Sequence, residues 1–134
     1  MAQKPKVLLL LGSAHGGSTI SNIVIGQHPK VFSAGTLEGF PDNGQFEAEN
    51  RCSCGEISYE CPFWNKILES IKNCSDEYQL EAKLFSKILE QSNREVVVDV
   101  AHGLNRLSQL ASVPNISLYV AYVKRPRRGV IHSI

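Results

Sequence analysis

The sequence predicts an α/β fold, a three-layer α/β/α sandwich in which a parallel sheet lies between helices. Residues 7–11, 96–100 and 116–123 are short and almost wholly apolar, as strands buried on both faces are. Segments with helical spacing of apolar residues separate these strands, and such alternation is typical of this class. A glycine-rich stretch follows the first strand directly, where folds of this class commonly bind anions.

The composition indicates one globular domain over residues 1–134, with a cysteine-bearing insertion at about 40–75. The formal net charge of +1 gives no general attraction to nucleic acid or to a membrane surface. No apolar run approaches the roughly 20 residues of a membrane span. The apolar run near the N-terminus is also too short for a signal peptide, so we expect a cytoplasmic protein.

In the N-terminal half, we expect the first helix to begin at Ser18 or Thr19 and to end near Gly26. A short second strand is predicted at 31–34, and a long exposed loop at 36–51. In the C-terminal half, apolar residues recur at helical spacing over 62–72, 78–91 and 104–111. In the last of these helices we expect four residues to face the core: Leu104, Leu107, Leu110 and Ala111.

Three features are predicted at the carboxyl edge of the sheet, where ligands bind in open α/β folds. They are the glycine loop, Asp99 near the end of its strand, and the basic run 124–128. Gly12, Gly17 and Thr19 match the outline G-x-x-x-x-G-[KST]-[ST] of a P-loop, whose backbone N–H groups hold phosphate. Ser18 stands where triphosphatases have lysine, which argues against ATP or GTP hydrolysis. A glycine-rich turn without a ligand remains the alternative.

Two stretches at opposite ends of the chain resemble sulfotransferases that use 3′-phosphoadenosine-5′-phosphosulfate (PAPS). Gly12–Thr19, GSAHGGST, resembles the 5′-phosphosulfate loop G-x-x-[RK]-S-G-[ST]-[ST]. Residues 125–133, RPRRGVIHS, resemble the 3′-phosphate segment R-D-P-R-G-V-x-x-S. The Cys-x-Cys-Gly and Cys-Pro-Phe-Trp segments are similar to those of bacterial-type members.

The resemblance implies a P-loop-like sulfotransferase domain, apparently truncated at the C-terminus, that transfers a sulfuryl group from PAPS to a hydroxyl or amine without a metal. Arg125 offers a charged planar fork for the 3′-phosphate, and a solvated basic turn is the alternative. The near-neutral charge disfavours a nucleic-acid partner. The donor-binding residues that the resemblance implies are Ser13, Ala14, His15, Gly16, Gly17, Ser18, Thr19, Arg125 and Ser133.

The chain departs from the family pattern at the positions that carry catalysis. His15 stands in place of an arginine or lysine against the 5′-phosphate, and is our catalytic candidate there. Thr36 occupies the place of the usual glutamate base, so Glu38 is the nearest candidate and His102 the second. An exposed loop acid is the alternative for Glu38, and a polar residue that caps the strand end is the alternative for His102.

Two other interpretations of the function remain open: a P-loop nucleotide kinase, or a truncated inactive domain that binds anions or a partner. A missing C-terminal half or an oligomer partner would complete the site. The cysteines at 52, 54, 61 and 74 lack the paired spacing of common zinc sites, so we expect no metal, with zinc as the alternative. Trp64 and Phe63 are predicted to pack in the core, with a lid over the acceptor as the alternative.

Overall fold

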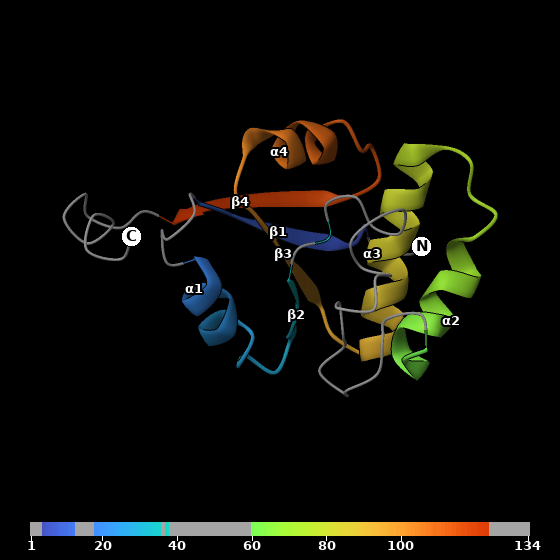
Figure 1. The fold of residues 1–134 in the computed structure, drawn as a ribbon, viewed down its shortest axis with the longest axis horizontal. Coiled ribbons are helices and arrows are strands. Elements are labelled where there is room, and N and C mark those ends of the chain that lie inside the picture. Colours follow the sequence, from blue (N-terminus) through green and yellow to red (C-terminus); the bar gives the residue numbers. More distant parts are fainter. Residues whose placement is uncertain (1–3, 13–17, 36, 38–59, 124–134) are drawn as a thin grey trace.

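The computed structural model describes residues 4–12, 18–35, 37 and 60–123. Within them, strands and helices alternate as predicted, and element boundaries agree to within one or two residues. None of the helices in these ranges is both long and apolar enough to cross a membrane. The elements are β1 (Lys6–Gly12), α1 (Ser18–Ile25), β2 (Val31–Gly35), α2 (Pro62–Ile71), α3 (Glu77–Ser92), β3 (Val96–Ala101), α4 (Leu104–Ala111) and β4 (Ser117–Val123) (Figure 1).

The four strands form one parallel sheet in the order β2-β3-β1-β4. β1 is central, and its Leu9 lies opposite Asp99 of β3 and Val120 of β4. Parallel strands of this kind need helices on both faces, because each strand presents apolar side chains alternately to the two sides. The predicted parallel α/β fold is therefore confirmed.

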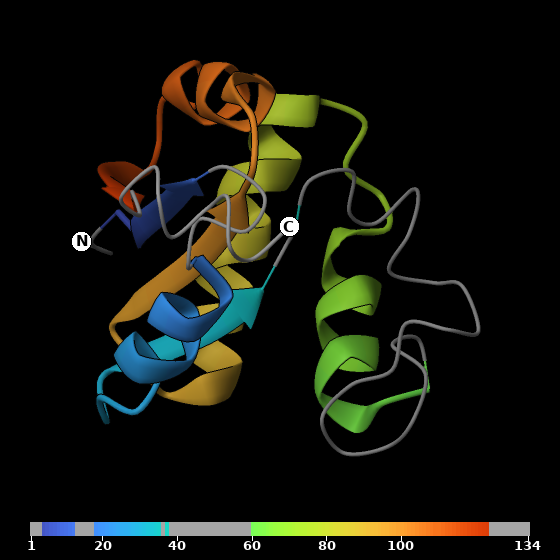
Figure 2. The same cartoon turned by 60° about the vertical axis from the view of Figure 1, so that its left-hand side comes forward.

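Alternate residues of the strands supply two separate hydrophobic cores. On one face, Val7, Leu9 and Leu11 pack in a core that includes residues of α2, α3 and α4. On the other face, Leu10 packs with Val98 and Val100, and Ile25 of α1 lies against this second core. Figures 1 and 2 show α4 and α1 on opposite sides of the sheet. The helices thus form the two outer layers that the sequence predicts.

The order of the strands creates a topological switch between β1 and β3. The connection from β1 leads through α1 to β2, whereas the connection from β3 leads through α4 to β4, in the opposite direction across the sheet. Because such crossovers are right-handed, opposite directions put the two helices on opposite faces. The connections that leave the carboxyl ends of these two neighbouring strands therefore go to opposite faces, and this is where ligands bind in open α/β sheets.

One helix differs from the prediction in the face that it buries. Leu104 and Ala111 are exposed, whereas Arg106 and Leu110 are buried. Residues 104 and 111 are two turns apart and share one side of α4, while 106 and 110 share another. The side of α4 that carries Arg106 faces the core because its guanidinium pairs there with two buried carboxylates, as described below. The expected inward positions of Leu104 and Ala111 were wrong.

Aromatic packing holds α2 against β2. The ring of Phe63 stacks on Phe32 with centroids 5.1 Å apart, and Trp64 contacts both rings edge-on. Trp64 itself is only 9% exposed and belongs to the core. The predicted core packing of Phe63 and Trp64 is confirmed.

Gly35 ends β2 with a positive φ of 72°, next to an irregularity in the pairing with β3. A Cβ at this position would meet nothing within 4 Å, so the backbone conformation alone favours glycine. We predict that Gly35→Ala lowers the free energy of unfolding by about 1 kcal/mol. Urea denaturation followed by circular dichroism measures this change.

Gly103→Ala is the matched control. A Cβ at Gly103 is equally free of contacts, but φ there is −144°, a conformation open to any residue. We therefore expect a clearly smaller effect, and equal losses in the two variants would contradict the conformational explanation.

Candidate functional site

Only part of the predicted donor site lies within the described residues. Ser18 and Thr19 form the beginning of α1, as expected. Residues 13–17, which include His15, lie outside the described residues, as do Glu38, Arg125 and Ser133. Their assignment to PAPS binding or catalysis stays a prediction.

The carboxyl edge of the sheet is formed by β1, β3 and β4, which end almost level. Leu11 of β1 lies opposite Ala101 of β3 and Tyr122 of β4, and Gly12 lies opposite Val123. The glycine-rich residues 13–17 connect this edge to the N-terminus of α1, whose first N–H groups have no partner within the helix. Unpaired donors and the positive end of the helix dipole favour an anion there.

His102 lies at the switch between β1 and β3. It follows the last residue of β3, and its Nδ1 is 3.3 Å from the carbonyl oxygen of Gly12. A carbonyl only accepts hydrogen bonds, so Nδ1 donates the proton and the neutral ring keeps a lone pair on Nε2. His102 as a whole is exposed. This geometry is compatible with two roles for His102: it can accept a proton from a substrate, or it can cap the end of β3 as a polar residue.

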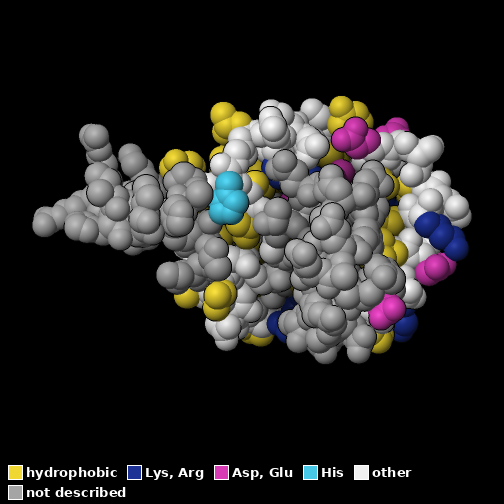
Figure 3. Space-filling model, viewed as in Figure 1, with side chains coloured by type: hydrophobic (Ala, Val, Ile, Leu, Met, Phe, Trp, Pro, Cys, Tyr) yellow, Lys and Arg dark blue, Asp and Glu magenta, His cyan; other side chains and the backbone are white. Residues whose placement is uncertain are grey.

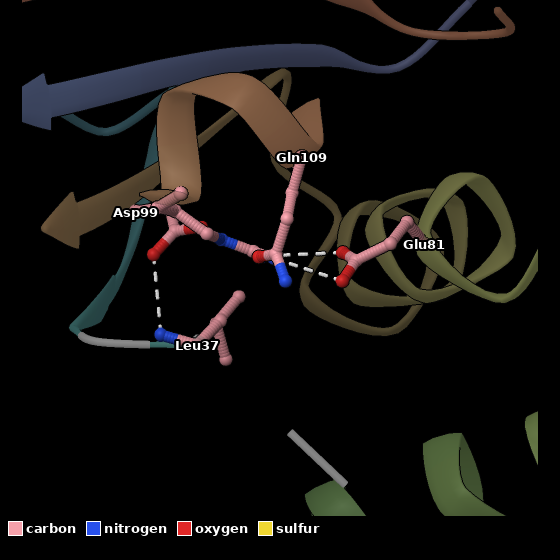
Figure 4. Close-up of polar contacts among 5 residues, drawn as sticks. Leu37, Glu81, Asp99 and Gln109 are labelled. Carbon is pink, nitrogen blue, oxygen red and sulfur yellow. Dashed lines mark hydrogen bonds and ion pairs between the residues drawn. The ribbon is translucent and has the colours of Figure 1, made fainter. Parts of the chain in front are cut away.

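A buried ionic cluster lies beneath this edge, in the core between the sheet and helices α3 and α4. Arg106 is fully buried and donates from Nε to Asp99 Oδ2 at 2.8 Å. Its two terminal nitrogens donate to the two carboxylate oxygens of Glu81, at 2.8 and 3.1 Å. Nη1 also donates to Gln109 Oε1 at 3.2 Å. Figure 4 shows Asp99 and Glu81 on opposite sides of the guanidinium.

The second oxygen of Asp99 fixes the chain that leaves β2. Asp99 Oδ1 accepts the backbone N–H of Leu37 at 3.1 Å, and the Leu37 side chain is fully buried (Figure 4). Burial is the largest influence on Asp99 and raises the pKa of its carboxyl, while the Arg106 charge opposes this rise. Asp99 lies near the carboxyl end of β3, as predicted, but its side chain is fully buried and both of its oxygens are bonded inside the core.

The cluster therefore joins β3, α3, α4 and residue 37, with two side chains from α4 and one group from each of the others. Sequence reasoning missed it, although Asp99 within an apolar strand was a usable signal. A carboxylate buried in a strand requires a cation or hydrogen-bond donors, and Arg106 lies seven residues later on the next helix.

Of the four cysteines, Cys61 and Cys74 lie within the described part of the chain. Cys61 is buried at the beginning of α2, and Cys74 is half-buried after its end. Within the described ranges, no group of three or more histidine, cysteine or acidic side chains is arranged to hold a metal ion. Cys52 and Cys54 lie outside these ranges.

Comparison with protein-family models gives no match, and comparison with curated proteins gives none either. Among solved structures, a sulfotransferase domain from the curacin biosynthetic pathway is similar, with a TM-score of 0.46 and 18% sequence identity. The match covers 90% of this chain and 46% of that one, so this chain spans less than half the length of the matched structure.

We predict that Arg106→Leu lowers the free energy of unfolding by about 3–5 kcal/mol, because it leaves two buried carboxylates without a cation. Urea denaturation at neutral pH measures the loss. Arg94→Leu is the control, because Arg94 is exposed and its effect should stay below about 1 kcal/mol. Similar losses for both arginines would contradict the role of the buried cluster.

The raised pKa of Asp99 predicts a pH dependence. The folded chain holds this proton more tightly than the unfolded chain, whose carboxyl has the ordinary pKa of 3.8. The stabilisation from that proton is fully present below about pH 4 and is lost as the pH rises through the raised pKa. Unfolding free energies measured from pH 4 to 7 should therefore fall for the wild type relative to Asp99→Asn. A rise in the unfolding free energy of the wild type relative to Asp99→Asn would contradict this prediction, because it would mean that Arg106 holds the pKa of Asp99 below its ordinary value.

Proposed function

We propose that this chain binds PAPS at the carboxyl edge of β1 and transfers its sulfuryl group to a hydroxyl or amine acceptor. The observation that supports this most is the position of the glycine-rich segment. It begins at Gly12, where the central strand ends beside the topological switch, and continues into the N-terminus of α1. An anion at this place meets backbone donors and the positive end of a helix dipole.

The sequence of the segment favours a phosphosulfate over a nucleoside triphosphate. Gly16, Gly17, Ser18 and Thr19 supply backbone donors and two hydroxyls, but no lysine for outer phosphates. In the proposal, His15 lies against the 5′-phosphate, and Arg125 with Ser133 binds the 3′-phosphate that distinguishes PAPS from ATP.

The reaction is a single in-line displacement. A lone pair of the acceptor oxygen or nitrogen forms a bond to sulfur, while the bond between sulfur and the bridging oxygen of the 5′-phosphate breaks. The products are the sulfated acceptor and 3′-phosphoadenosine 5′-phosphate, and the acceptor proton passes to a base. Donors of the glycine-rich segment stabilise the charge that develops on the leaving phosphate.

Two residues are proposed for that base. His102 is supported by its position at the switch, where the contact with Gly12 leaves the lone pair on Nε2. Glu38 is supported by the sequence, because it is the carboxylate nearest to Thr36, which occupies the place of the usual glutamate base. We favour His102, since its tautomer suits proton uptake.

Titration calorimetry with 3′-phosphoadenosine 5′-phosphate, set beside ATP, tests the donor site. We expect micromolar binding of the bisphosphate, weak or no binding of ATP, and loss of bisphosphate binding in Arg125→Ala and His15→Ala. No binding by a chain that circular dichroism shows to be folded would contradict the proposal. Preferential ATP binding with magnesium-dependent turnover would instead identify the kinase.

Three variants of His102 test the base. The amide nitrogen of Asn in His102→Asn can keep the contact with the Gly12 carbonyl, but no group then replaces Nε2. We expect kcat to fall by about 10²–10⁴, with unchanged affinity for 3′-phosphoadenosine 5′-phosphate. His102→Gln, which puts an amide near the position of Nε2, should lose as much because it cannot accept the proton. Near-normal kcat in His102→Asn with a loss in His102→Ala would indicate a purely structural role.

A further inference from the structure

The strand β4 forms one edge of the sheet, and its sequence lacks the features by which proteins prevent an edge strand from pairing. Among the described residues, β4 pairs with β1 alone. It runs for seven residues, SLYVAYV, with neither a charged residue nor a proline. Tyr119, Val120 and Tyr122 are 57%, 48% and 63% exposed. A long, apolar and uncharged edge strand readily pairs with a strand of another chain.

The opposite edge of the sheet, formed by β2, is protected. This strand has only five residues, and its pairing with β3 is irregular next to Gly35. Phe63 of α2 stacks on its Phe32. Figure 3 shows most of the visible charged side chains over α2 and α3, whereas hydrophobic side chains and a histidine lie at the other end, where β4 ends. The contrast indicates that β4 is the edge open to a partner.

The backbone of β4 directs alternate residues to this open edge. Ser117 donates its N–H to the carbonyl oxygen of Pro5, on the β1 side. Because the backbone groups of successive residues in a strand point alternately to its two sides, the odd-numbered residues of β4 bond to β1. The even-numbered residues, Leu118, Val120 and Tyr122, therefore direct their N–H and C=O groups outward, where a partner strand can bond to them.

We propose that this partner is a second copy of the chain, and that two β4 strands pair antiparallel about a two-fold axis at Val120. In this register Val120 lies opposite its own copy, and Leu118 lies opposite Tyr122. All three outward residues of each strand then face outward residues of the other, so each of their N–H and C=O groups has a partner. The two four-stranded sheets become one continuous sheet.

Symmetry excludes the parallel alternative. A two-fold axis along the strands would put each outward residue level with its own copy. A parallel ladder instead slants its hydrogen bonds, as Ser117 shows, because it bonds to Pro5 although it lies level with Lys6. In such a ladder an outward residue lies level with a residue whose groups point away. Of the two orientations, only the antiparallel one satisfies the edge in a closed dimer.

The side chains of the antiparallel pair also fit one another. Leu118 packs against the core shared with α3 and α4, and Ala121 against the core on the other face. Tyr122 shares the face of Leu118, and Tyr119 shares that of Ala121. Each tyrosine therefore meets a smaller apolar residue of the other copy rather than a second ring, and no like charges meet. Such cross-strand pairs stabilise a sheet.

Sedimentation velocity of the full chain tests the pairing. One strand edge is a small interface, so we expect a dimer with a dissociation constant of roughly 1–100 µM. Val120→Lys puts two like charges opposite each other at the axis and should weaken the dimer at least about tenfold, as should Val120→Glu. An equimolar mixture of these two variants should dimerise again, because opposite charges then meet at the axis.

Leu104→Lys is the matched control, because Leu104 is also exposed but lies on α4. It should leave the dimer unchanged, and a loss equal to that of Val120→Lys would overturn the proposal. So would a wild-type chain that stays monomeric at about 500 µM, or a Val120→Lys variant that dimerises normally. A mixture that stays monomeric, although circular dichroism shows both variants folded, would also overturn it. The pairing does not rest on the proposed reaction, so failure of 3′-phosphoadenosine 5′-phosphate to bind would leave it standing.

Discussion

The buried guanidinium of Arg106 is the interaction on which the geometry of this protein depends. It lies between two carboxylates of different elements, Asp99 on β3 and Glu81 on α3, and Asp99 also holds the N–H of Leu37. Buried carboxylates without a cation would cost more than most single contacts can offset. The cluster therefore fixes α4 and the chain after β2 relative to the end of β3, and through the end of β3 it fixes His102.

The position of the proposed site follows from the order of the strands as well as from the side chains. β1 and β3 are neighbours whose connections go to opposite faces, so the chain leaves Gly12 and His102 in opposite directions although the two strand ends stay in contact. One side of this edge leads through the glycine-rich segment to the N-terminus of α1, which suits an anion. The other side leads to His102 and the beginning of α4.

Hydrophobic patterning was sufficient to predict the elements and the layered fold, because apolar spacing reports burial directly. It failed for α4, where the inward side is set by Arg106: its ion pairs with Asp99 and Glu81 override the apolar pattern of Leu104 and Ala111. The same limit applied to the contact of Asp99 with the N–H of Leu37, which spans 62 residues, and to that of His102 with Gly12, which spans 90. Motif spacing, in contrast, identified the glycine-rich segment and the basic run, whose chemistry stays a prediction because most of these residues lie outside the described structure.

The measurement that tests the account most directly is a titration of the ¹⁵N-labelled chain with 3′-phosphoadenosine 5′-phosphate, followed by NMR. We expect the largest shifts at the backbone amides of Gly16–Thr19 and smaller shifts at His102, whereas the amides of α2 and of the α3 residues distant from the cluster should stay unchanged. Shifts centred elsewhere, or none at saturating ligand in a folded chain, would contradict the placement of the donor at the carboxyl edge of β1.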